Sequence, residues 1–186
     1  MMPENPKRDR NGKFSRAFVL VMAGATGAML TATAILLIAI GSGYGDAQLS
    51  EYEKQAIAVV AMQNEITGRW NRIVDLFNNS DVTSQREHIV LFTASLDSVY
   101  DLITDSQAVI DEWIKIDAPD EHVSSYQLGL EALMATQDGL ILFEEYFQNS
   151  VDTLVADQIR ADAATAKLVY AAELWRAAAE VAAGEG

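Results

Sequence analysis

From Thr83 to Ile116 the chain reads TSQREHIVLFTASLDSVYDLITDSQAVIDEWIKI, and its apolar residues recur at alternating spacings of three and four. The repeat consists of Ile89, Phe92, Leu96, Val99, Ile103, Ile110 and Trp113, and only Ser106 interrupts it. On an α-helix these positions share one face. Such a heptad repeat is typical of a helix in a bundle or a coiled coil. We therefore predict a helix over residues 83–116 with one face buried against other helices.

The segment before this helix has the same pattern. Between residues 47 and 78 the spacings of three and four join Val59, Met62, Ile66, Trp70, Ile73 and Phe77. Asn78-Asn79-Ser80-Asp81 is typical of a turn. Ser84 and Glu87 match a capping box that starts the next helix, with Asp81 or Thr83 as alternative caps.

Two further helices are predicted after Pro119, the only proline beyond residue 40. The third covers 119–148, with Val123, Tyr126, Leu130, Leu133, Leu140 and Phe147 facing inward. At Asn149-Ser150 either a turn caps a fourth helix or one helix continues. We favour the turn, because a single helix over 119–183 would extend ~95 Å and leave half its length without partners.

The fourth predicted helix, 151–183, is rich in alanine, which allows close approach of a neighbouring helix. Its buried face is predicted to hold Leu154, Leu168, Ala172, Trp175 and Ala179. Four helices of this length with short connections predict an all-α, up-down-up-down four-helix bundle about 40–45 Å tall over residues 47–183. No sustained alternation of apolar and polar residues indicates a strand.

A different segment precedes the bundle. Ala17 to Ile40 is a run of 24 residues without a charge. As a helix it would extend about 36 Å, enough to cross a hydrocarbon core of ~30 Å. We predict one transmembrane signal-anchor helix over 17–40, followed by a flexible Gly-rich linker over 41–46.

The alternative to an anchor is a cleavable signal peptide. Ala39-Ile40-Gly41 would serve as a cleavage site with small residues at the required positions. However, signal-peptide cores have ~7–15 apolar residues, and the run here is longer. The polar head of 16 residues is also long for a signal peptide. We therefore favour the uncleaved anchor, which places the bilayer around residues 17–40.

Charge predicts the orientation of this anchor. Residues 1–16, a polar tail predicted to be disordered, hold five basic and two acidic residues, net +3. The remainder holds eight basic and 25 acidic residues, net −17. Since positive flanks stay inside, the N-terminus is predicted to be cytoplasmic and the acidic domain extracytoplasmic, in the cell membrane. Such a domain should repel nucleic acid and anionic lipid.

Few residues suggest chemistry. The chain has no cysteine, which excludes disulfides and thiolate metal sites. The two histidines, His88 and His122, begin successive predicted helices, so they should lie ~40 Å apart at opposite ends, each partly solvated. No phosphate loop, nucleophile elbow or zinc-binding His-Glu-x-x-His is present. We expect a protein that is not an enzyme and needs no metal or other cofactor.

Two groups of residues remain as candidate sites. Trp113 and Trp175, with Tyr126, are predicted to lie near one end of the bundle, as core residues or as the wall of a small pocket or partner groove. Gly24, Ala28 and Ala32 are four residues apart in the predicted span, a ridge of small residues that favours helix–helix packing in a bilayer.

The functional hypothesis follows from this layout. We predict a non-catalytic interaction protein, a membrane-tethered helical bundle that forms a homodimer or docks on another membrane or envelope component. The alternative is a ligand-binding module that holds a small solute between its helices. An anchor with an external four-helix bundle resembles bacterial sensor ectodomains in layout, which favours this alternative by architectural analogy alone.

Overall fold

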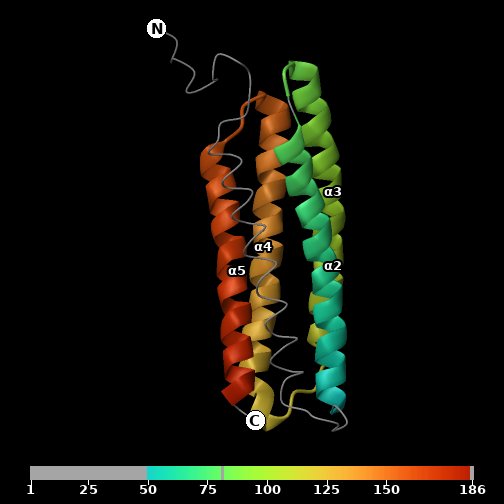
Figure 1. Cartoon of the computed structure of the whole chain (residues 1–186), viewed down its shortest axis with the longest axis vertical. Coiled ribbons are helices and arrows are strands. Elements are labelled where there is room, and N and C mark those ends of the chain that lie inside the picture. The colour runs from blue at the N-terminus through green and yellow to red at the C-terminus, as the bar shows by residue number, and fades with distance from the viewer. Residues whose placement is uncertain (1–49, 81, 185–186) are drawn as a thin grey trace.

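The structure, a computed structural model, describes residues 50–80 and 82–184, and no strand occurs among them. Its elements are α2 (Glu51–Asn79), α3 (Gln85–Trp113), the short 3-10 helix η1 (Asp120–His122), α4 (Val123–Thr153) and α5 (Gln158–Gly184). Successive α-helices run in opposite directions, with their axes along the length of the molecule (Figure 1). The predicted all-α helical bundle is confirmed for this part of the chain.

The predicted tail 1–16, span 17–40 and linker 41–46 lie outside the described residues. Within residues 50–80 and 82–184, no helix combines the length and apolar character needed to cross a membrane. Below, the lower end of the bundle is the end in Figure 1 where α2 and α4 begin, and the upper end is the one where α3 and α5 begin.

Capping boxes start the first two described helices. In α2, the Glu53 amide donates to Ser50 Oγ (3.2 Å) and the Ser50 amide donates to Glu53 Oε2 (2.6 Å). In α3, Ser84 and Glu87 make the same exchange at 3.2 and 3.0 Å. These bonds satisfy amides that a helix start leaves without partners. The predicted capping box at Ser84 is therefore confirmed.

The predicted break between the third and fourth helices exists, but it was placed too early. α4 continues through Asn149 and Ser150 to Thr153 and ends at Leu154 in the left-handed region, with φ 58° and ψ 25°. Ser150 does not cap α5, because its hydroxyl donates back to the Tyr146 carbonyl at 2.8 Å. Leu154, predicted on the buried face of the fourth helix, lies in the loop instead.

Asp157 takes the capping role that Asn149 or Ser150 was expected to play. Its Oδ1 accepts from the amides of Ile159 (3.1 Å) and Arg160 (3.4 Å). Arg160 returns a side-chain bond from Nε to Asp157 Oδ2 at 3.1 Å. A carboxylate at this position also interacts favourably with the positive end of the helix dipole. The loop between α4 and α5 is thus tied down at its α5 side.

Helices that are neighbours along the chain pack against each other, and the contact between α4 and α5 is the most extensive. Small residues explain the closeness of this pair. A Cβ on Gly139 of α4 would lie 2.5 Å from Leu168 Cδ2 and 3.4 Å from the Ala164 carbonyl oxygen of α5. The α5 residues predicted to be buried, Leu168, Ala172, Trp175 and Ala179, are all buried. The predicted close approach of the alanine-rich helix is confirmed.

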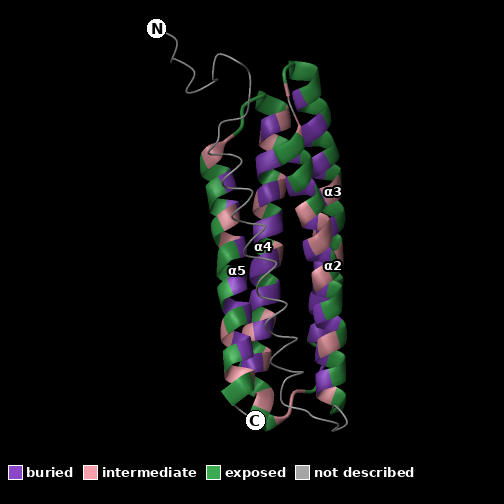
Figure 2. Cartoon of the chain, in the orientation of Figure 1, coloured by how far each residue is buried: buried purple, intermediate pink, exposed green. Residues whose placement is uncertain are grey.

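Several predicted core positions are exposed or half-buried, and for most of them an adjacent residue is buried instead. Met62, Ile89 and Val123 are 38%, 38% and 36% exposed. Gln63 and His88 are buried beside the first two. Ile103 is only half-buried, whereas its neighbour Leu102 is fully buried. A strict heptad buries two residues in every seven, whereas the buried faces coloured in Figure 2 include more than this. A residue adjacent to a predicted core position can therefore also reach the interior.

Candidate functional site

The predicted aromatic residues come together at the lower end of the bundle. Trp113 closes α3, Tyr126 lies in the first turn of α4, and Trp175 lies on α5. The Trp113 ring stacks on Tyr126 with centroids 5.6 Å apart and meets Trp175 edge-on at 5.8 Å. Trp113 Nε1 donates to the Tyr126 carbonyl at 3.2 Å, and the Tyr126 hydroxyl donates to the Trp113 carbonyl at 3.4 Å. We call these three residues the lower aromatic cluster.

The lower aromatic cluster is tightly packed. Trp113 and Trp175 are 2% and 3% exposed, and Trp113 lies directly against Gly129 of α4. Burial raises the pKa of the Tyr126 hydroxyl. The buried Trp175 Nε1 has no hydrogen-bond partner in the described part of the chain. A pocket lined by these residues stays a prediction, and in the structure their rings contact one another.

A second aromatic cluster at the upper end was not predicted. His88 of α3 stacks on Phe92 at 4.2 Å, and Phe77 of α2 stacks on Phe147 of α4 at 5.4 Å. His88 Nε2 lies 3.2 Å from the Ser150 carbonyl oxygen. The expectation that His88 is partly solvated is therefore wrong. The spacing of four between His88 and Phe92 is the sequence signal that could have placed this ring inside.

His122 lies at the other end of the bundle, as predicted. Its ring stacks on Tyr52 near the start of α2, with centroids 4.9 Å apart and an interplanar angle of 9°. Across the described residues there is no group of three or more His, Cys, Asp or Glu side chains placed to hold a metal ion. Trp70, the third tryptophan, packs separately against Phe143 of α4 at 4.4 Å.

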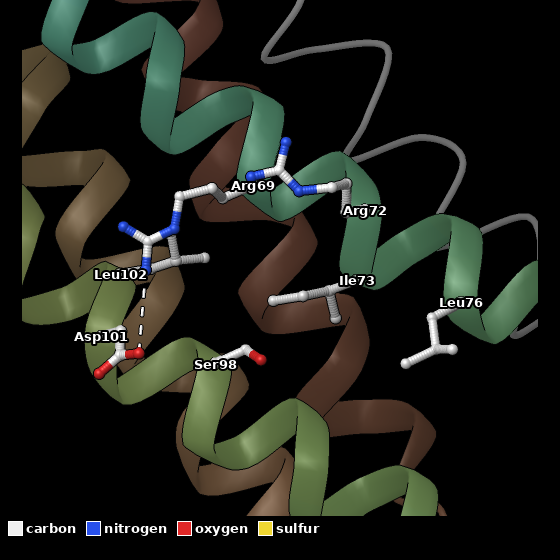
Figure 3. Close-up of a pocket in the computed structure, with 7 residues that line it drawn as sticks. All are labelled: Arg69, Arg72, Ile73, Leu76, Ser98, Asp101 and Leu102. Carbon is white, nitrogen blue, oxygen red and sulfur yellow. Dashed lines mark ion pairs between the residues drawn. The ribbon is translucent and has the colours of Figure 1, made fainter.

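A surface hollow of about 290 Å³ lies between α2 and α3. Figure 3 shows its lining, which consists of Arg69, Arg72, Ile73, Leu76, Ser98, Asp101 and Leu102. Its polar groups largely have partners within the protein. Arg69 pairs with Asp101 at 4.0 Å and also with Asp105, and Ser98 Oγ donates to the Ala94 carbonyl at 2.9 Å.

The hollow is poorly suited to a small ligand. Ligand sites are usually enclosed and contain several polar groups that converge on one point. Here Arg72 is the only lining cation without a partner in the described chain, and the Asp101 carboxylate in the same lining disfavours an anion. The third candidate group, Gly24, Ala28 and Ala32, lies outside the described residues.

Comparisons of the chain with models of protein families, with curated proteins and with solved structures found no match. The fold and the geometry of the described residues are therefore the basis for any functional argument. They define a helical bundle with two packed aromatic clusters and an acidic surface.

Proposed function

We propose that the chain is a non-catalytic, membrane-anchored docking protein whose acidic helical bundle lies outside the cytoplasm. The observation that carries the proposal is the uncharged run Ala17–Ile40, set between a head of net +3 and a remainder of net −17. This asymmetry favours a span with a cytoplasmic N-terminus. The bilayer is then the first partner of the protein, and nucleic acid is disfavoured by charge.

The described residues support a docking role over a catalytic one. Charged side chains form pairs on the surface, as in Lys115 with Glu112 at 2.6 Å and Arg160 with Asp157 at 3.1 Å. In catalytic sites, by contrast, a nucleophile or base is oriented by further groups in a cleft. A helical bundle with a shared buried core suits the display of a surface outside the membrane.

The anchor also offers a route to association. Gly24, Ala28 and Ala32 form a ridge on which another transmembrane helix packs closely. The hydrophobic effect supplies little drive between helices within lipid, so close van der Waals packing decides which helices pair. We propose that this ridge holds a homodimer or a membrane-protein partner.

Protease accessibility tests the topology. The full chain carries one tag before residue 1, and protease is added to spheroplasts with a cytoplasmic protein as integrity control. The expected result is digestion of the domain after residue 46 and protection of the N-terminal tag. Full-length protein in the medium, or a mature N-terminus near Gly41, would overturn the proposal, because either result removes the anchor.

The second candidate function is a ligand-binding module, and one observation favours it. Trp175 Nε1 is a buried donor without a partner among the described residues, and it lies beside Trp113. A small solute with an acceptor oxygen would satisfy it. A large shift of the Trp175 indole resonance when a candidate carboxylate or amide solute is added, absent in Trp175→Phe, would favour this candidate over docking.

A further inference from the structure

The outer face of α4 carries an apolar stripe that no described helix covers. Its members are Val123, Leu130, Met134 and Ile141, and their spacings of seven, four and seven place them on one side of the helix. Met134 is 53% exposed, Ile141 37% and Val123 36%, while Leu130 is half-buried. The buried residues Ala132, Gly139 and Phe143 lie on the opposite side of the helix. We call the four residues the α4 stripe.

The border of the α4 stripe toward α5 is partly neutralised by side chains of α5. Three acidic residues of α4 follow this border at intervals of seven, and each has a partner on α5. Tyr170 donates its hydroxyl to Glu131 Oε1 at 2.6 Å. Lys167 pairs with Asp138 at 3.1 Å, and Arg160 pairs with Glu145 at 3.5 Å. Lys167 and Arg160, two of the eight basic residues beyond residue 16, thus form ion pairs along this border.

The border toward α3 combines a neutral contact with one hydrogen-bonded carboxylate. Gln137 Nε2 donates to Gln107 Oε1 at 3.0 Å, a neutral contact. Glu144 accepts a hydrogen bond from Tyr100, and this bond raises the pKa of the Tyr100 hydroxyl. A protein of net charge −14 should repel a copy of itself over most of its surface. Along the α4 stripe the ion pairs with Lys167 and Arg160 reduce this repulsion, while Glu131 and Glu144 have tyrosine partners that carry no charge.

We propose that the α4 stripe is the contact between the bundles of two copies of this chain, arranged side by side and parallel. This inference rests on the proposed function, because the anchor ridge is what holds two copies parallel in one membrane. In a parallel pair each residue meets its own equivalent across the two-fold axis. Gln137, the polar residue in the otherwise apolar repeat, would then help to fix the register.

The size of the stripe explains why the anchor is needed. Stable interfaces bury about 800 Å² on each partner. Four side chains, none of them more than 53% exposed, provide much less area than this. The contact therefore depends on the high effective concentration that a shared membrane anchor creates. The domain without its anchor should remain monomeric in dilute solution.

Cysteine cross-linking in the full chain tests the inference, because the chain has no cysteine of its own. Met134→Cys places one thiol in the stripe. Met62→Cys is the matched control, since Met62 is also an exposed methionine (38%), about the same distance along its helix, but on α2. Under mild oxidation in native membranes, Met134→Cys should give several-fold more disulfide-linked dimer than Met62→Cys. Ile141→Cys, one heptad further, should behave like Met134→Cys.

The outcomes separate this inference from the proposed function. If both variants cross-link equally, the links report random collision and the stripe contact is wrong. If sedimentation in mild detergent shows a dimer but Met134→Cys and Ile141→Cys do not link, the stripe is wrong while the anchor dimer stands. A chain that is monomeric in membranes overturns the stripe contact and the homodimer together, but leaves the topology result of the protease experiment untouched. Gly24→Leu with Ala28→Leu should reduce the Met134→Cys cross-link.

Discussion

Gly129 of α4 lies directly under the indole of Trp113, so that a Cβ at this glycine would be 2.5 Å from Trp113 Cζ2. Real Cβ atoms do not approach other atoms so closely. Glycine inside a helix costs about 1 kcal/mol relative to alanine. The glycine is nevertheless required here, because it makes room for the large ring that joins α3, α4 and α5 at the lower end.

The first prediction concerns the independence of the bundle. Residues 46–186 should express as a soluble, highly helical monomer, since α2, α3, α4 and α5 all contribute to one cluster of buried apolar residues. Circular dichroism measures the helix content and sedimentation the mass. A strand-rich spectrum would refute the bundle. A stable dimer would show that the anchor is not needed for association.

The second prediction uses two glycines in helix interiors. Gly129→Ala should destabilise the domain by about 1–3 kcal/mol, because the added methyl group overpacks against Trp113. Gly68→Ala, which has no atom within 4 Å of the added Cβ, should stabilise it by roughly 0.5–1 kcal/mol. Urea unfolding of residues 46–186 gives both free energies. Equal effects of the two changes would contradict the packing at Gly129.

The third prediction compares neighbours on α3. Leu102→Asp should unfold the domain or cost more than about 4 kcal/mol, because Leu102 is fully buried and a charge there loses its water without a partner. Ile103→Asp should cost clearly less, because Ile103 is only half-buried. Thermal unfolding followed by circular dichroism separates the two variants. The opposite ranking would restore the strict heptad seam predicted from the sequence.

The fourth prediction concerns Leu154, the non-glycine residue at positive φ within the described ranges. Its left-handed conformation costs a residue with a Cβ about 1 kcal/mol, which glycine avoids. Leu154→Gly should therefore raise the free energy of unfolding by up to about 1 kcal/mol. Val155→Gly, at an exposed position without positive φ, should lower it instead. A loss of stability in both variants would show that Leu154 is not strained.

The fifth prediction concerns acid sensitivity at the start of α3. Hydrogen bonds from the amides and hydroxyls of Thr83 and Ser84 hold the pKa of the Glu87 carboxyl below its ordinary value. A depressed pKa in the folded state means that this carboxylate stabilises the fold above its unfolded-state pKa, and that the contribution is lost as pH falls through the folded-state pKa.

The difference in unfolding free energy between the natural chain and Glu87→Gln should accordingly shrink as pH is lowered through that window. Carboxyl-carbon NMR of Glu87 gives its pKa directly. A difference that stays constant with pH, or a titration at the ordinary value, would contradict the capping geometry.

Much of the fold could be read from local patterns. The spacing of apolar residues predicted every described α-helix, and Ser84 with Glu87 predicted the start of α3 because capping boxes depend on residues only three apart. The meeting of Trp113, Tyr126 and Trp175 was also predictable, because alternating helices of similar length bring the end of one beside the start of the next.

Other features depend on tertiary contacts that no local pattern contains. Asn149-Ser150 has the composition of a helix cap, but Ser150 lies one turn beyond Tyr146 and close to His88, so its polar groups have partners within the helix and across it. His88 and Gln63 are buried because the interior is wider than the heptad seam. The α4 stripe was not predicted either, because the heptad pattern assigned Val123 and Leu130 to the core.

The packing of each helix mainly on its neighbours along the chain has a consequence for how the protein folds. Contacts close in sequence form quickly, because little chain entropy is lost in bringing them together. A chain emerging N-terminus first can therefore join α2 to α3 and then α3 to α4 before α5 appears. α5 is the helix that packs last, on helices that are already joined. Until it does so, the side of α4 that contacts α5 is exposed to solvent. Docking of the alanine-rich α5 is then the step that ends the exposure of the nascent domain to aggregation.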